Sequence, residues 1–118
     1  AGDTSILDER VLNGLKETND RLGHEAGDEL LRKTADGLRA AIRTGDVASR
    51  VGGDEFAVLL PNCSEEHAMA FGERLRERLR GLGVSAAVGC AGRAPGRDLH
   101  AAWRLADERM YRDKATHA

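Results

Sequence analysis

The sequence predicts an α/β fold in which one sheet is covered by helices. Apolar residues recur at helical spacing in segments 28–42, 64–81 and from residue 98 onward, and short apolar runs lie between these segments. The chain has 118 residues, 41% of them hydrophobic, which is enough apolar material for one core. We therefore expect a single domain over residues 1–118.

Charge and composition argue against several function classes. The chain has 18 Lys and Arg residues and 20 Asp and Glu residues. The resulting net charge of −2 argues against a DNA-binding domain, in which an excess of basic residues is expected. A local basic site for a small anionic ligand remains compatible with that balance. No apolar run reaches the length of a membrane span and no signal peptide is visible, so we expect a cytoplasmic domain without membrane contact. Cys63 and Cys90 lack metal-ligand spacing and are expected to be small buried hydrophobes.

The N-terminal half predicts two helices. Residues 4–16 are the least regular segment and favour a helix over a strand, with Asp3 or Thr4 as its cap. Residues 28–42 predict an amphipathic helix with Asp28 as a candidate N-cap. The apolar face of this helix consists of Leu31, Ala35, Leu38 and Ile42.

The C-terminal half predicts a hairpin, a further strand and two helices. The runs 47–52 and 56–61 flank a glycine-containing four-residue loop, which is typical of a β-hairpin. A helix over 64–81 begins at the cap Ser64, and a strand of small residues covers 83–91. The last helix follows the cap Asp98, and its apolar face consists of Leu99, Ala102, Trp103, Ala106 and Met110.

The tip of the predicted hairpin carries the most informative residues, Gly52, Gly53, Asp54 and Glu55. Turns commonly need glycines and carry solvated carboxylates, so a purely structural role explains these residues about equally well. They also suit a ligand, because glycines let a backbone approach closely and adjacent carboxylates hold a hard cation. Mg²⁺ commonly binds one or two carboxylates together with phosphate oxygens, so a nucleotide is a natural partner.

Three motifs in order resemble the GGDEF family of diguanylate cyclases. The segment Arg50 to Phe56 reads R-V-G-G-D-E-F and contains the family signature. The segment Asn19 to Asp28 resembles the family's N-D-x-x-G-H-x-x-G-D motif, and Ala106 to Lys114 resembles its A-D-x-x-x-Y-x-x-K helix. The resemblance covers residues 13–114, and three motifs in this order are far more specific than a lone pentapeptide.

This resemblance implies a fold, a reaction and an assembly. The implied fold is a central, mostly antiparallel sheet covered by helices, related to nucleotidyl cyclases and polymerase palms, with GGDEF at a hairpin tip. The family condenses two GTP molecules into cyclic di-GMP and releases two pyrophosphates in bacterial signalling. It acts as a homodimer in which each protomer holds one GTP. The implied cofactor is Mg²⁺ or Mn²⁺.

The resemblance also implies a catalytic and metal-binding set. Asp54 and Glu55 match the metal-binding carboxylates, and Glu55 is also a candidate for activating the 3′-hydroxyl. The backbone carbonyl of Leu12 matches a further metal ligand. Lys16 matches a lysine that contacts the terminal phosphates as a point charge and completes the catalytic set. If the neighbouring motifs are left aside, the simplest interpretation of Lys16 is a solvent-exposed lysine on a helix.

The implied substrate-binding set comes from all three motifs. Asn19 and Asp28 match the pair that recognises guanine, and Lys114 matches a second lysine on the terminal phosphates. Gly52 and Gly53 would leave room for the α and β phosphates. A helix cap at Asp28 and a solvated lysine at position 114 are the purely structural alternatives.

A second site is implied by the segment Arg43-Thr44-Gly45-Asp46. An R-x-x-D lying five residues before the glycine pair matches the family's inhibitory product site, which would make the enzyme feedback-inhibited. Arg43 could hold a phosphate or a guanine edge, and Asp46 would complete the site. The alternative is an arginine at a helix end beside a turn aspartate.

The sequence departs from the family pattern at position 11, where Val11 stands in place of the other metal-binding aspartate. Residues 5–12 also resemble the family's first helix rather than the central strand expected before Lys16. We therefore hypothesise that a segment is missing between about residues 10 and 13, and that the domain is N-terminally incomplete. If Val11 is genuine, it favours an inactive enzyme.

Two other functions stay open from the sequence. The first is a degenerate GGDEF domain that binds GTP or cyclic di-GMP as a non-catalytic regulatory module, which Val11 favours. The second is a plain α/β interaction domain without a ligand, which a failure to bind any guanine nucleotide would support.

Overall fold

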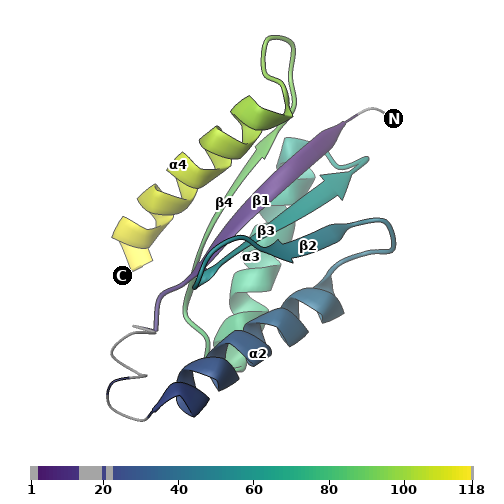
Figure 1. Cartoon of the computed structure of the whole chain (residues 1–118). Helices are drawn as coiled ribbons and strands as arrows, with labels where there is room; N and C mark the ends of the chain where they lie inside the picture. Colours follow the sequence, from purple (N-terminus) through teal and green to yellow (C-terminus); the bar gives the residue numbers. More distant parts are fainter. Residues whose placement is uncertain (1–2, 14–19, 21–22, 118) are drawn as a thin grey trace.

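The computed structural model describes residues 3–13, 20 and 23–117. Within these residues, four strands and three helices follow the order β1, α2, β2, β3, α3, β4, α4 (Figure 1). The strands are Thr4–Val11, Val47–Arg50, Glu55–Pro61 and Ala86–Gly92, and the helices are His24–Ala41, Glu65–Gly81 and Leu99–His117. Within the described residues, no helix is both long and apolar enough to cross a membrane.

The four strands form one antiparallel sheet in the order β2-β3-β1-β4. The N-terminal strand β1 therefore lies in the interior of the sheet, with β3 on one side and β4 on the other (Figure 1). Leu7 shows the register, because it lies opposite Val58 on β3 and Cys90 on β4. This arrangement confirms the predicted α/β class with a mostly antiparallel sheet.

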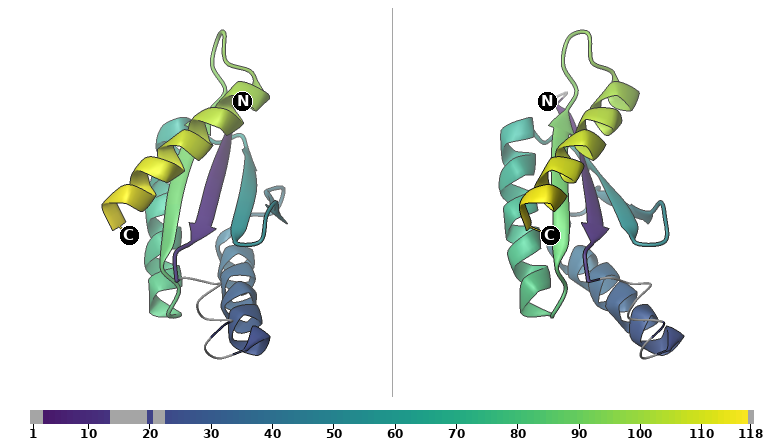
Figure 2. Two further views of the ribbon diagram at one scale, coloured as in Figure 1. Left: turned by 60° about the vertical axis from the view of Figure 1, so that its left-hand side comes forward. Right: turned by 90° about the vertical axis from the view of Figure 1, so that its left-hand side faces the viewer.

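The helices cover the sheet on both faces. Helix α3 packs on one face with α2 beside it, and α4 crosses the opposite face over β4 and β1 (Figure 2). The larger core lies under α3, where Leu7 and Val58 are completely buried. A smaller core under α4 is built from alanines, and its central residues Ala102 and Ala106 are also completely buried.

The prediction of a helix over residues 4–16 is wrong for the described part of that segment, because residues 4–11 form β1. Neighbouring strands supply hydrogen-bonding partners on both sides of this segment, and that tertiary pairing overrides its weak helical pattern. The missing-segment hypothesis rested partly on the absence of a central strand, and β1 supplies that strand. The hypothesis itself remains a prediction that an intact mass would test.

Asp28 is not the cap of its helix, contrary to the prediction. Helix α2 begins at His24, and Gly23 precedes it with a φ of 87°, a left-handed conformation that favours glycine. Asp28 therefore lies on the exposed surface of α2, beyond its first turn. Asp3 and Thr4 cap no helix either, because Thr4 begins β1. The caps at Ser64 and Asp98 are confirmed: the Ser64 hydroxyl accepts a hydrogen bond from the His67 amide, and Asp98 accepts one from the Ala101 amide.

The small residues of β4 allow α4 to approach the sheet closely. A side chain at Gly89 would overlap the backbone of α4 at Ala106 and Met110. This contact explains the predicted preference for small residues in that strand. The predicted apolar face of α4 is only partly correct, since Trp103 is half-buried and Leu99 is exposed.

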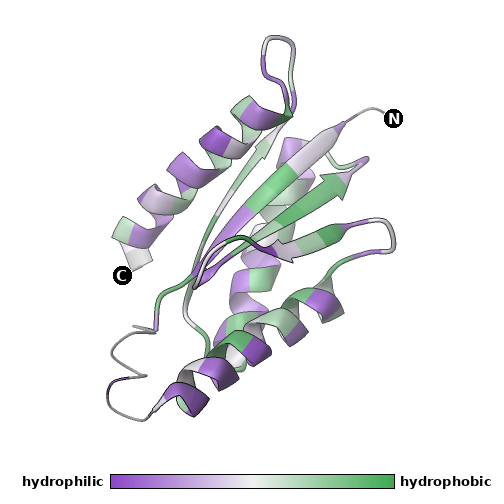
Figure 3. Cartoon of the chain, viewed as in Figure 1, coloured by the Kyte–Doolittle hydropathy of each residue, from purple (hydrophilic) through white to green (hydrophobic). Residues whose placement is uncertain are grey.

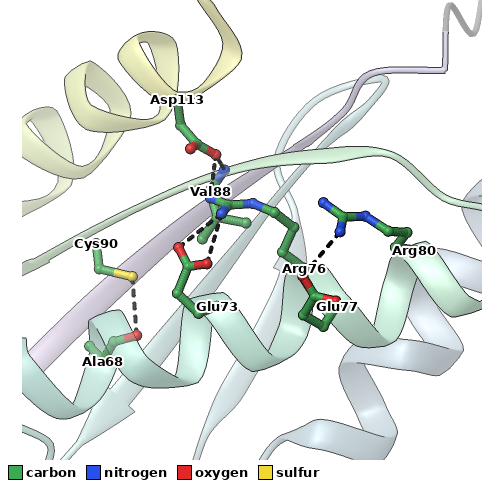
Figure 4. A network of polar contacts seen from close by, with 8 residues as sticks. All are labelled: Ala68, Glu73, Arg76, Glu77, Arg80, Val88, Cys90 and Asp113. Carbon is green, nitrogen blue, oxygen red and sulfur yellow. Dashed lines mark hydrogen bonds and ion pairs between the residues drawn. The ribbon is translucent and has the colours of Figure 1, made fainter. Parts of the chain in front are cut away.

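A polar network joins α3 to α4 across the outer edge of β4 (Figure 4). The buried guanidinium of Arg76 donates to Glu73 at 2.8 Å and to Asp113 of α4 at 2.5 Å. Asp113 also accepts a hydrogen bond of 2.7 Å from the backbone amide of Val88. Because β4 is an edge strand, this contact protects one of its unpaired amides.

Both cysteines are free and buried, as predicted. Burial raises the pKa of the Cys90 thiol to about 12, which is the behaviour of a structural rather than a reactive cysteine.

Candidate active site

The glycine pair lies in the turn between β2 and β3, so the predicted hairpin is confirmed. Arg50 fixes this turn, because its guanidinium donates to the carbonyl oxygens of Gly52 at 3.1 Å and Gly53 at 2.7 Å. The amides of Val51 and Gly52 both donate to the carbonyl oxygen of Glu55. The turn thus carries Asp54 and Glu55 at the start of β3.

The C-terminal end of β1 lies directly beside this turn. The Val11 amide donates to the carbonyl oxygen of Asp54 at 2.9 Å, and the next amide, of Leu12, donates to the carbonyl oxygen of Ser85. Position 11 is therefore next to the signature carboxylates, where the resemblance expects a metal-binding aspartate. The valine side chain is buried and offers no metal ligand.

Arg10 contacts both signature carboxylates. Its guanidinium lies 3.0 Å from Glu55 Oε1 and 3.9 Å from Asp54 Oδ1. The guanidinium also lies over the Tyr111 ring, 5.3 Å from its centroid, and the Lys114 ammonium is 6.0 Å from the same centroid. A cation of the protein itself therefore pairs with both carboxylates that the resemblance assigns to the metal ion.

A buried acidic group lies under α4 next to Arg10. Carboxylate oxygens of Asp8, Glu55 and Asp107 all lie within 4.8 Å of one another. Asp8 is completely buried, and neither of its oxygens accepts a hydrogen bond within the described part of the chain. Burial, followed by its contacts with the other two carboxyl groups, raises the pKa of Asp8 to about 10.

Glu9 points to the opposite face of the sheet, into the core under α3. It lies between Phe56 on β3 and Val88 on β4, and its side chain is completely buried. Its oxygens have no hydrogen-bond partner among the described residues. Burial, and secondarily the charges of Asp54 and Glu55, raises its pKa to about 8. Figure 3 shows this polar end of β1 following its hydrophobic middle.

An open cleft of about 460 Å³ lies between α2 and the β2–β3 hairpin. Asp28 lines this cleft from α2, and Arg50 and Phe56 line it from the hairpin. The cleft therefore joins a residue from the second motif to residues that flank the glycine pair. Lys16 and Asn19 lie outside the residues that the structure describes.

Arg43 and Asp46 are in direct contact. The Arg43 guanidinium donates to Asp46 at 3.1 Å and to the carbonyl oxygen of Pro61 at 2.9 Å. The Arg43 backbone amide donates to the same carboxylate at 2.8 Å. The R-x-x-D segment is thus preformed as a turn at the far end of β2.

Comparison with known proteins identifies the family. The family model described as "Diguanylate cyclase, GGDEF domain" matches residues 11–118. The chain belongs to the GGDEF domain family. A probable diguanylate cyclase of Escherichia coli, DgcJ, is 33% identical over 107 residues, which cover 87% of this chain and 22% of that protein. The chain thus spans about a fifth of that curated relative.

Two solved GGDEF domains share the fold over 97% of this chain. The GGDEF domain of PA1120 (YfiN or TpbB) from Pseudomonas aeruginosa is 33% identical, with a TM-score of 0.84 and 77% of that chain covered. The active GGEEF domain of a diguanylate cyclase from Vibrio cholerae is 26% identical, with a TM-score of 0.86 and 78% covered. The resemblance stated from the three motifs is confirmed.

Sequence reasoning missed the polar residues of β1 in this GGDEF domain. The sequence pattern places Asp8, Glu9 and Arg10 in a helix, and Asp107 enters only as a motif residue. No period-2 signal marks this segment, because the charged Glu9 stands between Leu7 and Val11 at the spacing where a strand would carry an apolar residue.

Proposed function

We propose that this domain is a diguanylate cyclase that converts two GTP molecules into one cyclic di-GMP and two pyrophosphates. The observation that supports this proposal is the position of Asp54 and Glu55 on a hairpin turn that Arg50 holds by two hydrogen bonds, beside the cleft lined by Asp28. Two copies would face each other, each holding one GTP. Each 3′-hydroxyl loses its proton and attacks the other α-phosphate, and the bond to pyrophosphate breaks.

The substrate would be held by the cleft residue Asp28, by the glycine turn and by residues of the matched motifs. Asp28 would accept hydrogen bonds from the guanine edge together with Asn19, which distinguishes guanine from adenine. A side chain at Gly53 would meet no atom of the described residues within 4 Å, so phosphates could approach the turn closely. Lys16 and Lys114 would bind the terminal phosphates.

The chemistry of the donor set fits a hard divalent cation, Mg²⁺ or Mn²⁺. Asp54, Glu55 and the backbone carbonyl of Leu12 would hold it. Such a cation neutralises negative charge on the phosphates during displacement. Arg10 partly neutralises the same carboxylates in the absence of substrate.

A second candidate function is a non-catalytic module that binds GTP or cyclic di-GMP. The observation that favours it is the apolar Val11 beside Asp54, together with the ion pairs made by Arg10. Both features reduce the capacity of the turn to bind a metal ion, and neither obstructs the cleft at Asp28.

Product formation from GTP with Mg²⁺ or Mn²⁺ separates the two functions. We expect cyclic di-GMP from the wild-type domain, none from Asp54→Ala, and more from Val11→Asp, which adds a carboxylate beside the turn. Val47→Asp, at an exposed position on β2, is the matched control and should behave as wild type. No product from wild type or from Val11→Asp, with GTP bound, would favour the non-catalytic module.

Feedback inhibition is a further part of this proposal. Cyclic di-GMP would bind at Arg43 and Asp46, and to do so it must displace the Arg43–Asp46 pair. We expect Arg43→Ala to lose product inhibition while initial turnover is retained, measured as the concentration of added product that halves the rate. Inhibition unchanged in Arg43→Ala would refute this site.

A further inference from the structure

Three different elements contribute carboxylates to the acidic group under α4. Asp8 comes from the middle of β1, Glu55 from the first residue of β3, and Asp107 from α4. Asp8 lies opposite Ala57 on β3 and Gly89 on β4, so small neighbours leave room for the helix to approach. The oxygens lie within 4.8 Å of one another, a spacing that a single ion can span with metal–oxygen distances of about 2.0–2.4 Å.

Asp8 independently requires a positively charged ligand or a proton. Its side chain is completely buried, it faces the two other carboxylates, and neither oxygen accepts a hydrogen bond within residues 3–13, 20 and 23–117. Leaving a buried carboxylate without a partner is costly, so such groups are normally paired, protonated or bound to a metal ion. We propose that Asp8, Glu55 and Asp107 form a divalent-cation site that binds its ion in the absence of nucleotide.

The charges of the group match a divalent cation. The three carboxylates carry three negative charges, and Arg10 contributes one positive charge through Glu55 Oε1. The second oxygen of Glu55 is not used in that pair. An ion of charge +2 would neutralise the group, and oxygen-only donors select hard ions such as Mg²⁺, Mn²⁺ or Ca²⁺ over soft ones.

This site differs from the cation position in the proposed function. The latter uses Asp54 and the Leu12 carbonyl at the turn, whereas Asp8 and Asp107 lie on the α4 side of the sheet. Glu55 belongs to both. The inference therefore does not need catalysis to be correct, and metal binding without nucleotide tests it separately.

The experiment is a titration of the nucleotide-free domain with Mn²⁺ at pH 8, followed by the electron paramagnetic resonance signal of free Mn²⁺. We expect saturable binding of one Mn²⁺ per chain. Asp8→Asn and Asp107→Asn should each weaken binding by at least about tenfold, because each replaces a charged carboxylate ligand with a neutral amide oxygen. The matched control Asp36→Asn, a surface carboxylate paired only with Arg39 among the described residues, should bind as wild type. Asp54→Asn is measured beside it to separate this site from the cation position at the turn.

Thermal unfolding in EDTA keeps the test informative. The side-chain amide introduced by Asp8→Asn can donate its hydrogens to Glu55 and Asp107. We therefore expect this variant to fold with unchanged or higher stability and to lose the stabilisation by Mn²⁺ seen in wild type. If Asp8→Asn does not fold, Mn²⁺ binding by Asp107→Asn alone provides the test, since Asp107 is only partly buried. The absence of saturable Mn²⁺ binding to wild type would show that a proton occupies the group. Equal binding by all variants, or its loss in Asp54→Asn alone, would also overturn the proposal.

Discussion

Replacement of the buried Glu9 by leucine should stabilise the domain, and the gain should depend on pH. Glu9 is completely buried between Phe56 and Val88 on the face that also carries Leu7 and Val11. Its oxygens have no hydrogen-bond partner within the described residues. A leucine would continue the apolar face of β1 and remove a carboxyl group from the core under α3.

The magnitude follows from the pKa of Glu9, which burial raises from 4.5 to about 8. Because the folded chain holds this proton more tightly than the unfolded chain, proton binding by Glu9 contributes in full to the unfolding free energy below pH 4.5. That contribution is lost as the pH rises through about 8. The loss is about 1.4 kcal/mol per pH unit, or roughly 3 kcal/mol of unfolding free energy between pH 4.5 and pH 7.

Urea unfolding of the wild type and of Glu9→Leu between pH 4.5 and pH 8 measures this effect. The difference in unfolding free energy should grow with pH by roughly 3 kcal/mol up to pH 7. Glu9→Gln is the matched control, because it keeps the shape and polarity of the side chain but does not titrate. Its difference in unfolding free energy from wild type should grow with pH by the same amount and should be smaller at pH 4.5 than that of Glu9→Leu. A difference that stays constant with pH, or a Glu9→Leu variant less stable than wild type throughout, would refute the reasoning.

Two further predictions concern packing and the polar network between the helices. Gly89→Ala should destabilise the domain by about 1–3 kcal/mol or more, because the added methyl group meets the backbone of α4, which cannot move aside cheaply. Gly81→Ala should be neutral or stabilising, because the added methyl group would meet no other part of the described chain within 4 Å. Equal effects of the two substitutions on the free energy of unfolding in chemical denaturation would contradict the close approach at Gly89. Arg76→Met should cost about 3 kcal/mol by removing the cation between Glu73 and Asp113, whereas Arg80→Met, in an exposed pair, should cost under about 0.5 kcal/mol. Similar melting temperatures for the two arginine variants would show that the network contributes little.

The hairpin, the last two helices and β4 could be predicted because their signals are local. The glycine pair between two apolar runs indicated the hairpin, and Ser64 and Asp98 marked helix starts with side-chain caps that the structure contains. The composition of β4 predicted close packing, and Gly89 provides it. Each of these signals lies within its own segment of the sequence.

The strand β1 could not be predicted in the same way, since its structure depends on pairing with β3 and β4. Three consecutive charged residues, Asp8 to Arg10, are unusual in the interior of a sheet, so their propensity pointed away from a strand. Asp28 shows a similar limit, because α2 begins at His24 without a side-chain cap and nothing local marks that start. The cluster of Asp8 with Asp107 joins residues far apart in the chain and is visible only in the fold.

The measurement that tests the proposed cyclase activity most directly is the nucleotide balance after incubation of the purified domain with GTP and Mg²⁺ or Mn²⁺. Chromatography separates GTP from cyclic di-GMP, and an enzymatic assay counts pyrophosphate. The proposal predicts one cyclic di-GMP and two pyrophosphates for every two GTP consumed, with no product from Asp54→Ala. Stoichiometric binding of GTP without any cyclic di-GMP, at saturating nucleotide and metal, would contradict it and identify a non-catalytic GGDEF module.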